Sequence, residues 1–368
     1  MKKILVLVLA LILALGSLAA FAEAVDPATI EDNVTSADGT YEIAFVTDVG
    51  QLKDKSFNEG TWNGCKRYAA ENGLTYKYYQ PANGDQATDD DRYDAMKAAA
   101  DAGAKVIVCA GFMQGTALQK AAEEFTDVKF IFIDGWGMGL DNVVGVAFKE
   151  EQCGYLAGYA VVKDGYEELG FSGGGGGTNP ACCRYGYGFI QGANDAAKEM
   201  GKTVNMKFTW AYGASFSASA DLQTLISGWY ETGTEIVFSA GGSIFDSITA
   251  AASANDGAVV GVDVDQSFLS DTVVTSALKG IAEGTYQMLG KAYDGSWADL
   301  GGAVSLGINE DAVGLPVDTW SLEGFTVEDY QALVDAMKAG DLVVDDQAAE
   351  GDPNQKGPWD NVTVDYVE

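Results

Sequence analysis

Short apolar segments alternate with amphipathic stretches along the chain, and this pattern starts again near the middle. The apolar segments of the first series are residues 41–47, 105–109, 129–133 and 142–148. Those of the second series are residues 169–172, 235–239, 258–262 and 272–276. Short apolar runs between amphipathic helices are typical of parallel sheets covered by helices. The repeat therefore predicts an α/β protein with two Rossmann-like lobes and a cleft between them.

The order of the segments also predicts where each lobe begins and ends. We expect residues 1–24 to be a signal peptide, 25–40 a flexible leader, 41–149 with 265–302 the N-terminal lobe, and 150–264 with 303–368 the C-terminal lobe. The chain would then cross between the lobes near residues 148–152, 263–266 and 301–306. Two similar lobes joined by several crossings predict a hinge that closes on a ligand.

The N-terminus has the three parts of a secretory signal peptide. Lys2 and Lys3 precede the apolar run 4–14, and small-x-small sequences follow at 20–22 and 22–24. The alternative is a membrane anchor, since the apolar stretch approaches the roughly 20 residues of a span. No cysteine follows the expected cut, so we expect no lipid anchor. We predict a protein exported to the periplasm, cell surface or medium, without stable membrane insertion after cleavage.

Charge and composition exclude several classes of function. The chain has 22 Lys and Arg against 54 Asp and Glu, a net charge of −32, and no His. This balance argues against nucleic-acid binding, which needs clustered cations. Catalysis and metal binding that depend on His are excluded. The five cysteines show no metal-binding spacing, and their number is odd. We therefore expect no metal, no cofactor and a fold that does not depend on disulfides.

The segment after the first apolar strand holds candidate ligand-binding residues. Asp48, Phe57 and Asn58 follow the carboxyl end of this strand, the edge where open α/β sheets bind ligands. The Phe57 ring could stack on a planar ligand, while the two polar side chains offer directional hydrogen bonds. The alternative is that Asp54 or Ser56 caps the next helix and Phe57 faces the core.

Further candidates stand at the ends of other predicted strands. They are Phe112, Asp134, Gly242, Asp263 and Lys279. One such residue is usually a cap, but several at one sheet edge indicate a site. Lys279 is one of few cations and could offset either aspartate in a cleft.

Residues 173–177 are five consecutive glycines after a predicted strand. A phosphate-binding loop is one interpretation, but the Lys-Ser/Thr of a Walker motif is missing. A flexible connection between strand and helix is the interpretation that we favour.

Eight segments in order along the chain resemble the basic membrane protein family of solute-binding proteins, which serve ABC importers and include purine-nucleoside receptors. They are TDVGQLKDKSFN (47–58), CAGFMQGTALQKAAEEF (109–125), KFIFID (129–134), VAFKEEQCGYLAGYAV (146–161), GASF (213–216), FSAGGS (238–243), VVGVDVDQ (259–266) and VVTSALK (273–279). The resemblance implies the type I periplasmic-binding fold with a hinged interlobe cleft. It also implies a small-molecule ligand, a purine nucleoside, and ABC permease subunits as partners.

The resemblance assigns roles on the base side of such a ligand. Phe57 resembles the ring that stacks on the purine, and Phe216 is the candidate for the opposing ring, with Phe245 as an alternative. Asp48 and Asn58 would face the base.

On the sugar side, Asp263 and Lys279 resemble the pair that holds the ribose hydroxyls, with Asp134 contributing from the first lobe. The chain departs from the family in two places. It lacks the cysteine of a lipid anchor, and it has FSGGGGGTNPACC where the family usually has FVGGM.

We therefore predict a solute-binding receptor rather than an enzyme. A secreted nucleoside or sugar hydrolase that uses Asp134 and Asp263 remains an alternative. A ligand sensor of the same fold is another.

Overall fold

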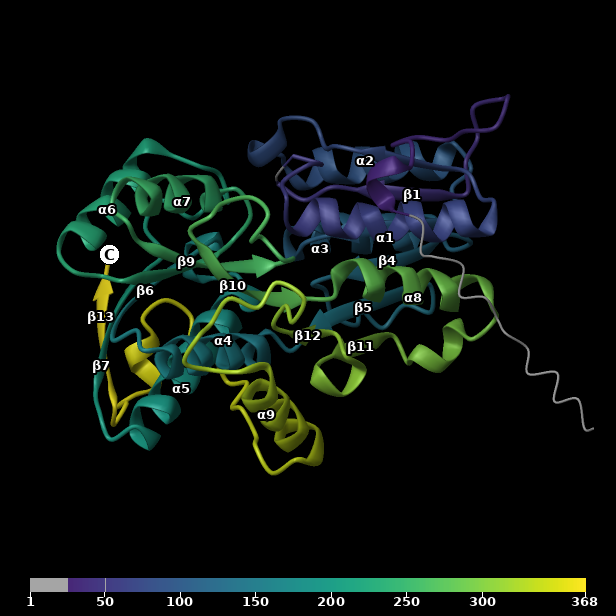
Figure 1. Cartoon of the computed structure of the whole chain (residues 1–368). Coiled ribbons are helices and arrows are strands. Elements are labelled where there is room, and N and C mark those ends of the chain that lie inside the picture. The colour runs from purple at the N-terminus through teal and green to yellow at the C-terminus, as the bar shows by residue number, and fades with distance from the viewer. Residues whose placement is uncertain (1–25, 50) are drawn as a thin grey trace, which may run out of the picture.

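The computed structural model describes residues 26–368 apart from Gly50. The predicted signal peptide, its cleavage sites and Val25 lie outside these residues. Two lobes lie side by side, one mostly purple and blue, the other teal to yellow (Figure 1). Among the helices of the described part, none has the length and apolar character needed to cross a bilayer.

The first lobe is a parallel sheet with the strand order β11-β5-β4-β3-β1-β2. Its strands are β1 (Ile43–Val46), β2 (Tyr76–Tyr79), β3 (Val106–Ala110), β4 (Lys129–Ile133), β5 (Val143–Phe148) and β11 (Ala303–Leu306). Its helices are α1 (Phe57–Asn72), α2 (Asp89–Asp101), α3 (Gly115–Glu124) and α8 (Ile281–Tyr293). Side chains alternate across a strand, so Phe45 packs under α1 and α8 while Val46 packs under α2 and α3.

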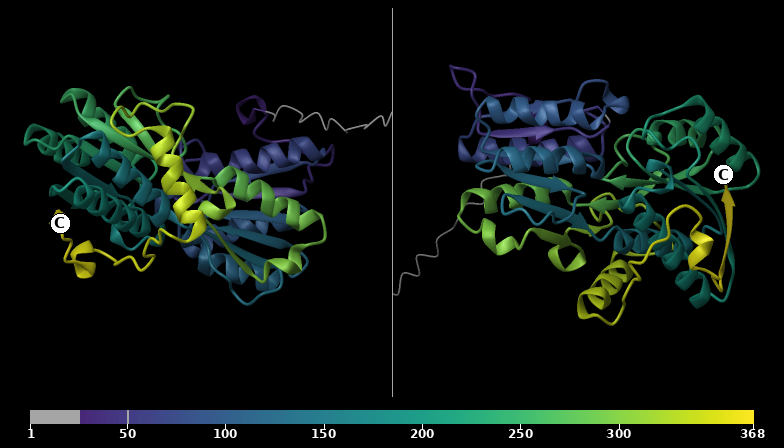
Figure 2. Two further views of the ribbon diagram at one scale, coloured as in Figure 1. Left: turned by 60° about the horizontal axis from the view of Figure 1, so that its bottom comes forward. Right: turned by 180° about the vertical axis from the view of Figure 1, so that it is seen from behind.

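The second lobe is a sheet with the order β12-β10-β9-β8-β6-β7-β13, parallel except for β12. Its strands are β6 (Glu168–Gly173), β7 (Val204–Thr209), β8 (Ile236–Ala240), β9 (Ala258–Asp263), β10 (Val273–Lys279), β12 (Val313–Gly314) and β13 (Val362–Val367). Its helices are α4 (Glu150–Asp164), α5 (Pro180–Glu199), α6 (Ala220–Glu231), α7 (Ile244–Ala254) and α9 (Val327–Ala339). Figure 2 shows β13 at the outer edge of this lobe.

The two parallel sheets confirm the predicted α/β architecture, but two strands lie in the other sheet from the one expected. β10 pairs with β9 in the second sheet, and β11 pairs with β5 in the first. The expected boundaries at 265–302 and 303–368 are therefore corrected. The chain crosses between the lobes after β5, after β10 and after β11. Apolar patterning marks a strand but does not say which neighbour it pairs with, because both sheets offer similar edges.

The segment before β1 differs from the flexible leader that we expected. Val34 forms a two-way backbone bridge with Tyr76, with N–O distances of 2.9 and 2.7 Å. The buried Lys66 donates to the carbonyl of Pro27 and pairs with Asp32 at 3.2 Å. These contacts attach residues 26–40 to the first lobe.

Candidate ligand-binding site

A cleft between the lobes holds about 610 Å³ of empty space, counting the part open to solvent. Every predicted site residue except Phe112 lines it: Asp48, Phe57, Asn58, Asp134, Phe216, Gly242, Asp263 and Lys279. The lining residues that were not predicted include Asn179, Cys182, Tyr185 and Ser243. The structure thus brings strand ends from both sheets to one place.

Two predicted aromatic residues lie elsewhere. At the end of β3 it is Gly111, with φ at 88°, that lines the cleft, and Phe112 turns away into a short 3₁₀ helix. Phe245 is 3% exposed in α7 and packs in the apolar cluster around Ile248. Phe216, rather than Phe245, is therefore the ring of the second lobe that lines the cleft.

Asp54 caps the start of α1, as one alternative expected. Its carboxylate accepts hydrogen bonds from the backbone N–H groups of Ser56, Asn58 and Glu59 at 3.0–3.1 Å. The hydroxyl of Ser56 does not take part in this cap. It donates a hydrogen bond to Asp263 of the second lobe at 2.5 Å. Phe57 is half-buried, packs against the core of the first lobe and also lines the cleft. The helix start is therefore both a capped structure and a wall of the site.

Asn58 and Asp48 differ in the hydrogen bonding that they leave open. The Asn58 side chain accepts from the Asp48 backbone N–H at 2.8 Å and donates to Asp54 at 3.0 Å. Asp48 Oδ1 has no hydrogen-bond partner among the described residues, although the side chain is only 8% exposed. Burial raises the pKa of Asp48 to about 7. Asp48 is therefore the polar group of this wall with the most bonding capacity left for a ligand.

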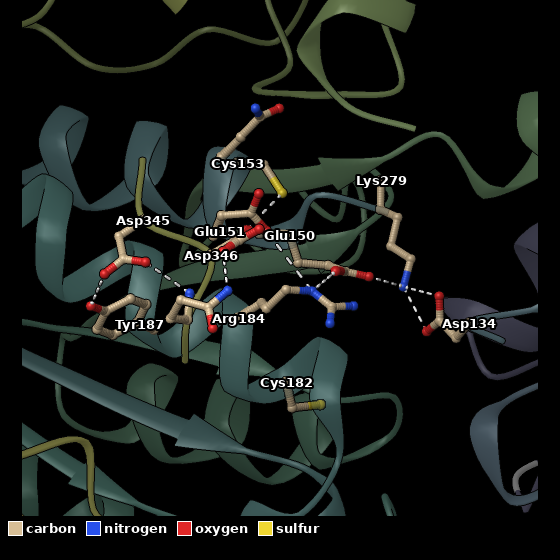
Figure 3. Close-up of polar contacts among 12 residues, drawn as sticks. Asp134, Glu150, Glu151, Cys153, Cys182, Arg184, Tyr187, Lys279, Asp345 and Asp346 are labelled. Atoms are coloured by element: carbon tan, nitrogen blue, oxygen red, sulfur yellow. Dashed lines mark hydrogen bonds and ion pairs between the residues drawn. The ribbon is translucent and has the colours of Figure 1, made fainter. Parts of the chain in front are cut away.

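A buried cluster of charges forms the side of the cleft nearest the hinge (Figure 3). Lys279 Nζ lies 2.6 Å from Asp134 Oδ1 and 2.9 Å from Glu150 Oε1. Arg184 Nε lies 2.6 Å from the other oxygen of Glu150. Asp134 belongs to the first sheet and Lys279 to the second, so this ion pair joins the lobes.

The pKa values follow from burial and from these pairs. Burial raises the pKa of Asp134 to about 6, while Lys279 opposes the shift. Burial alone would lower the pKa of Lys279, but the carboxylates of Asp134, Glu150 and Asp263 raise it. Burial opposes the ionisation of Glu150, yet Lys279 and Arg184 lower its pKa. Near pH 7 the cluster is therefore charged and internally compensated.

Asp263 receives a hydrogen bond on each carboxylate oxygen. Ser56 donates to one, and the Tyr185 hydroxyl donates to the other at 3.0 Å. Asp263 is the last residue of β9 and Asp134 directly follows β4, with φ at 66° and 56°. Asp tolerates this left-handed backbone better than most residues. The sharp turns bring both carboxylates to the space between the sheets.

Residues 42–339 match the family model for Bmp, described as "ABC transporter substrate-binding protein PnrA-like". The chain belongs to the Bmp family. The resemblance stated from the sequence segments is thereby confirmed. Members are ABC transporter substrate-binding proteins, so the chain is an extracytoplasmic protein that binds a small molecule and works with a permease.

Three relatives illustrate the spread of the Bmp family. The ABC transporter nucleoside-binding protein BmpA of Lactococcus lactis is 25% identical over 303 residues, 76% of this chain and 82% of that protein. Basic membrane protein B of Borreliella burgdorferi is 33% identical over 181 residues, 48% of this chain and 51% of that protein. A Pyrococcus abyssi relative, 25% identical over 300 residues, is named a lipoprotein. The lack of a lipid anchor in this chain stays a prediction.

Solved structures share the fold of this Bmp-family chain. A solute-binding protein from Aeropyrum pernix superposes with a TM-score of 0.65 at 23% identity, covering 83% of this chain and 88% of that one. One from Conexibacter woesei gives 0.64 at 20% identity, covering 84% and 100%. The predicted type I periplasmic-binding fold is confirmed.

Proposed function

We propose that this ABC substrate-binding protein binds a purine nucleoside between its lobes. The observation that carries the proposal is the mixed lining of the cleft, in which Lys279 Nζ lies 5.2 Å from the centroid of the Phe57 ring. Two rings from opposite lobes, Phe57 and Phe216, line it together with the charged groups Asp134, Asp263 and Lys279. A nucleoside likewise combines a flat base with a polar sugar. The name of the Lactococcus relative supports the same ligand class.

The base is held by stacking and by a hydrogen bond to Asp48 Oδ1. An aromatic ring stacked on a base contributes about 1–3 kcal/mol, whichever base it is. Asp48 Oδ1 accepts an N–H of the base edge, because it is buried and has no partner among the described residues. Asn58 contributes less than the resemblance implied, since both ends of its amide already bond to the protein.

The ribose is held by the charged side. The carboxylate of Asp263 keeps lone pairs beyond those used by Ser56 and Tyr185. These accept the neighbouring hydroxyls of the sugar, while Lys279 donates to them. Hydrogen bonds to charged groups contribute about 1.5–3 kcal/mol each. Asp134 keeps Lys279 charged and in place, and so takes part from the first lobe.

Binding at residues from both lobes couples the ligand to closure. Ser56 with Asp263 and Asp134 with Lys279 span the lobes at hydrogen-bond distance. The lobes are joined by three crossings of the chain, which allow a hinge motion. We expect small-angle scattering to show a smaller radius of gyration with saturating nucleoside. An unchanged radius would argue against a clamp.

A hydrolase is less well supported than a receptor. A carboxylate pair for glycoside hydrolysis needs one protonated acid beside the leaving group. Here Asp134 lies in an ion pair with Lys279, and both oxygens of Asp263 accept hydrogen bonds from protein hydroxyls. Incubation with inosine, followed by chromatography for hypoxanthine, separates the two functions. Released base would make the protein an enzyme.

The test of the ligand itself is mass spectrometry of small molecules released from the denatured protein. It is followed by calorimetric titration with inosine, guanosine and adenosine, with ribose and hypoxanthine as partial ligands. We expect a nucleoside to bind more tightly than either partial ligand. Binding of a sugar or peptide in its place would refute the proposal.

A further inference from the structure

The glycine run 173–177 begins at the last residue of β6, and two of its amides bond within the protein. The N–H of Gly174 donates to the carbonyl of Ala240 at 2.9 Å, and that of Gly175 donates to Gly213 at 3.1 Å. Residues 175, 176 and 177 have φ of 71°, 60° and 80°, which glycine adopts readily. These two amides are thus not available to bind an anion.

The ring of Phe216 lies directly on this loop. A Cβ added at Gly174 would come within 2.3 Å of two ring carbons, Cδ1 and Cε1. One at Gly175 would come within 3.1 Å of Cζ, and one at Gly241 within 3.3 Å of Cδ1. Phe216 itself has φ at 58° and donates its backbone N–H to Gly213 at 3.0 Å. The ring is therefore held by the bare backbone of glycines.

We propose that Gly174 is a positioning residue that sets the width of the cleft. Its missing side chain lets the Phe216 ring lie against the loop, which leaves space opposite Phe57 for one flat ring system. A methyl group at residue 174 would lie 2.3 Å from the Phe216 ring in its present position. An ordinary contact needs at least 3.4 Å, so the ring would move about 1 Å into that space. The inference rests on the proposed stacking of a base between the two rings.

Gly174 is the position where this idea can be tested cleanly. Its φ of −76° and ψ of 171° are allowed for alanine, so the substitution introduces no backbone strain. The three atoms nearest to an added Cβ all belong to Phe216. At Gly173 the added atom would meet Trp210, and at Gly241 it would meet the backbone of the loop. Substitutions there would disturb the fold for unrelated reasons.

The experiment is a double-mutant cycle of Gly174→Ala and Phe216→Ala, with Gly228→Ala as control. Gly228 lies in α6, and an added Cβ there has nothing within 4 Å. We expect Gly174→Ala to lower the melting temperature in the native background and to have little further effect once Phe216 is alanine. Gly228→Ala should leave the affinity near its native value and raise the melting temperature slightly, because alanine is favoured over glycine inside a helix.

Calorimetry with inosine and hypoxanthine supplies the second readout. We expect Gly174→Ala to weaken both ligands at least tenfold and by equal factors, because the ring faces the base. In the Phe216→Ala background it should add no further loss. Additive effects in the cycle, for melting or for binding, would overturn the inference.

The two proposals fail in different ways. If the native protein binds no purine, the proposed function is refuted, and the melting-temperature cycle still decides whether the glycine positions the ring. If Gly174→Ala does not fold, the double variant decides. A folded double variant supports the clash with Phe216, and an unfolded one overturns it.

Discussion

The charged side and the aromatic side of the cleft are held in place by different forces. On the charged side, Lys279 and Asp263 each bond to two protein groups, and the geometry is fixed by short polar contacts. On the aromatic side, Phe57 and Phe216 are placed by packing and by missing side chains. Polar contacts demand particular ligand atoms, whereas a ring face accepts any flat partner. We therefore expect the charged side to give specificity and the aromatic side to give affinity.

The largest effect is expected from removing the central cation. Lys279→Met leaves the carboxylate of Asp134 buried without its counter-ion, and Glu150 keeps only its pair with Arg184. Breaking a buried pair in this way lowers the free energy of unfolding by about 3–5 kcal/mol. Urea unfolding measures the loss. The matched control is Lys97→Met, since its pairs with Asp101 and Glu124 are exposed and worth about 1 kcal/mol or less. Equal losses would show that the cluster does not organise the site.

The next effect separates sugar from base. Asp263→Ala should weaken nucleosides by about 1.5–3 kcal/mol, because a charge-assisted hydrogen bond is lost. The free base should lose far less, and discrimination between inosine and deoxyinosine should disappear. Calorimetric titration with inosine, deoxyinosine and hypoxanthine measures this, with the exposed Asp271→Ala as control. Equal losses for nucleoside and base would mean that Asp263 does not contact the sugar.

The aromatic side should respond in the opposite manner. Phe57→Ala should weaken nucleosides and free bases alike by about 1–3 kcal/mol, because the ring that stacks on the base is lost. Phe57→Trp should retain most of the affinity. Phe268→Ala is the control, since this ring is 81% exposed and does not line the cleft. A loss confined to nucleosides would place the sugar, rather than the base, on this ring.

The strand-end residues were predictable because parallel strands bring their carboxyl ends to one edge. Asp48, Asp134, Asp263 and Lys279 follow from that rule and from apolar patterning alone. The same rule predicted that Phe112 lines the cleft. In the turn after β3 it is Gly111, with positive φ, that lines the cleft.

Other parts of the site depend on contacts that patterning does not show. Phe216 was reached only through the family resemblance, since it lies in an irregular loop. Glu150 is the first residue of α4, a position where charged residues are usually solvated, and its burial beside the partly buried Arg184 of α5 depends on tertiary packing. The exchange of β10 and β11 between the sheets has the same origin, since pairing depends on the whole fold.

The smallest effect concerns Asp48, which stands between the two sides because it is polar but lies among the base-facing residues. Burial raises the pKa of Asp48 to about 7. The backbone N–H of Val49 and the charge of Arg92 lower this pKa, whereas the charges of Asp134 and Asp54 raise it further. From pH 6 to pH 8 its ionised fraction rises about tenfold. If the carboxylate accepts an N–H from the base, affinity for inosine should rise by up to about tenfold over this range.

The stability of the protein should change with pH in the other direction. The pKa of Asp48 is raised from its ordinary value of 3.8 to about 7, so the folded state holds a proton that the unfolded chain releases. The contribution of this group to the free energy of unfolding therefore falls as the pH rises from about 4 to about 7. Asp48→Asn should remove the contribution of this group to both trends while keeping an acceptor in place.

Asp134 has a pKa raised to about 6 by burial and titrates in the native protein and in the variant alike, so the difference between the two proteins isolates Asp48. Calorimetry and urea unfolding from pH 5 to pH 8 measure the two slopes. An affinity that falls with pH would mean that the protonated acid donates to the base, and a flat profile would mean that Asp48 does not contact it.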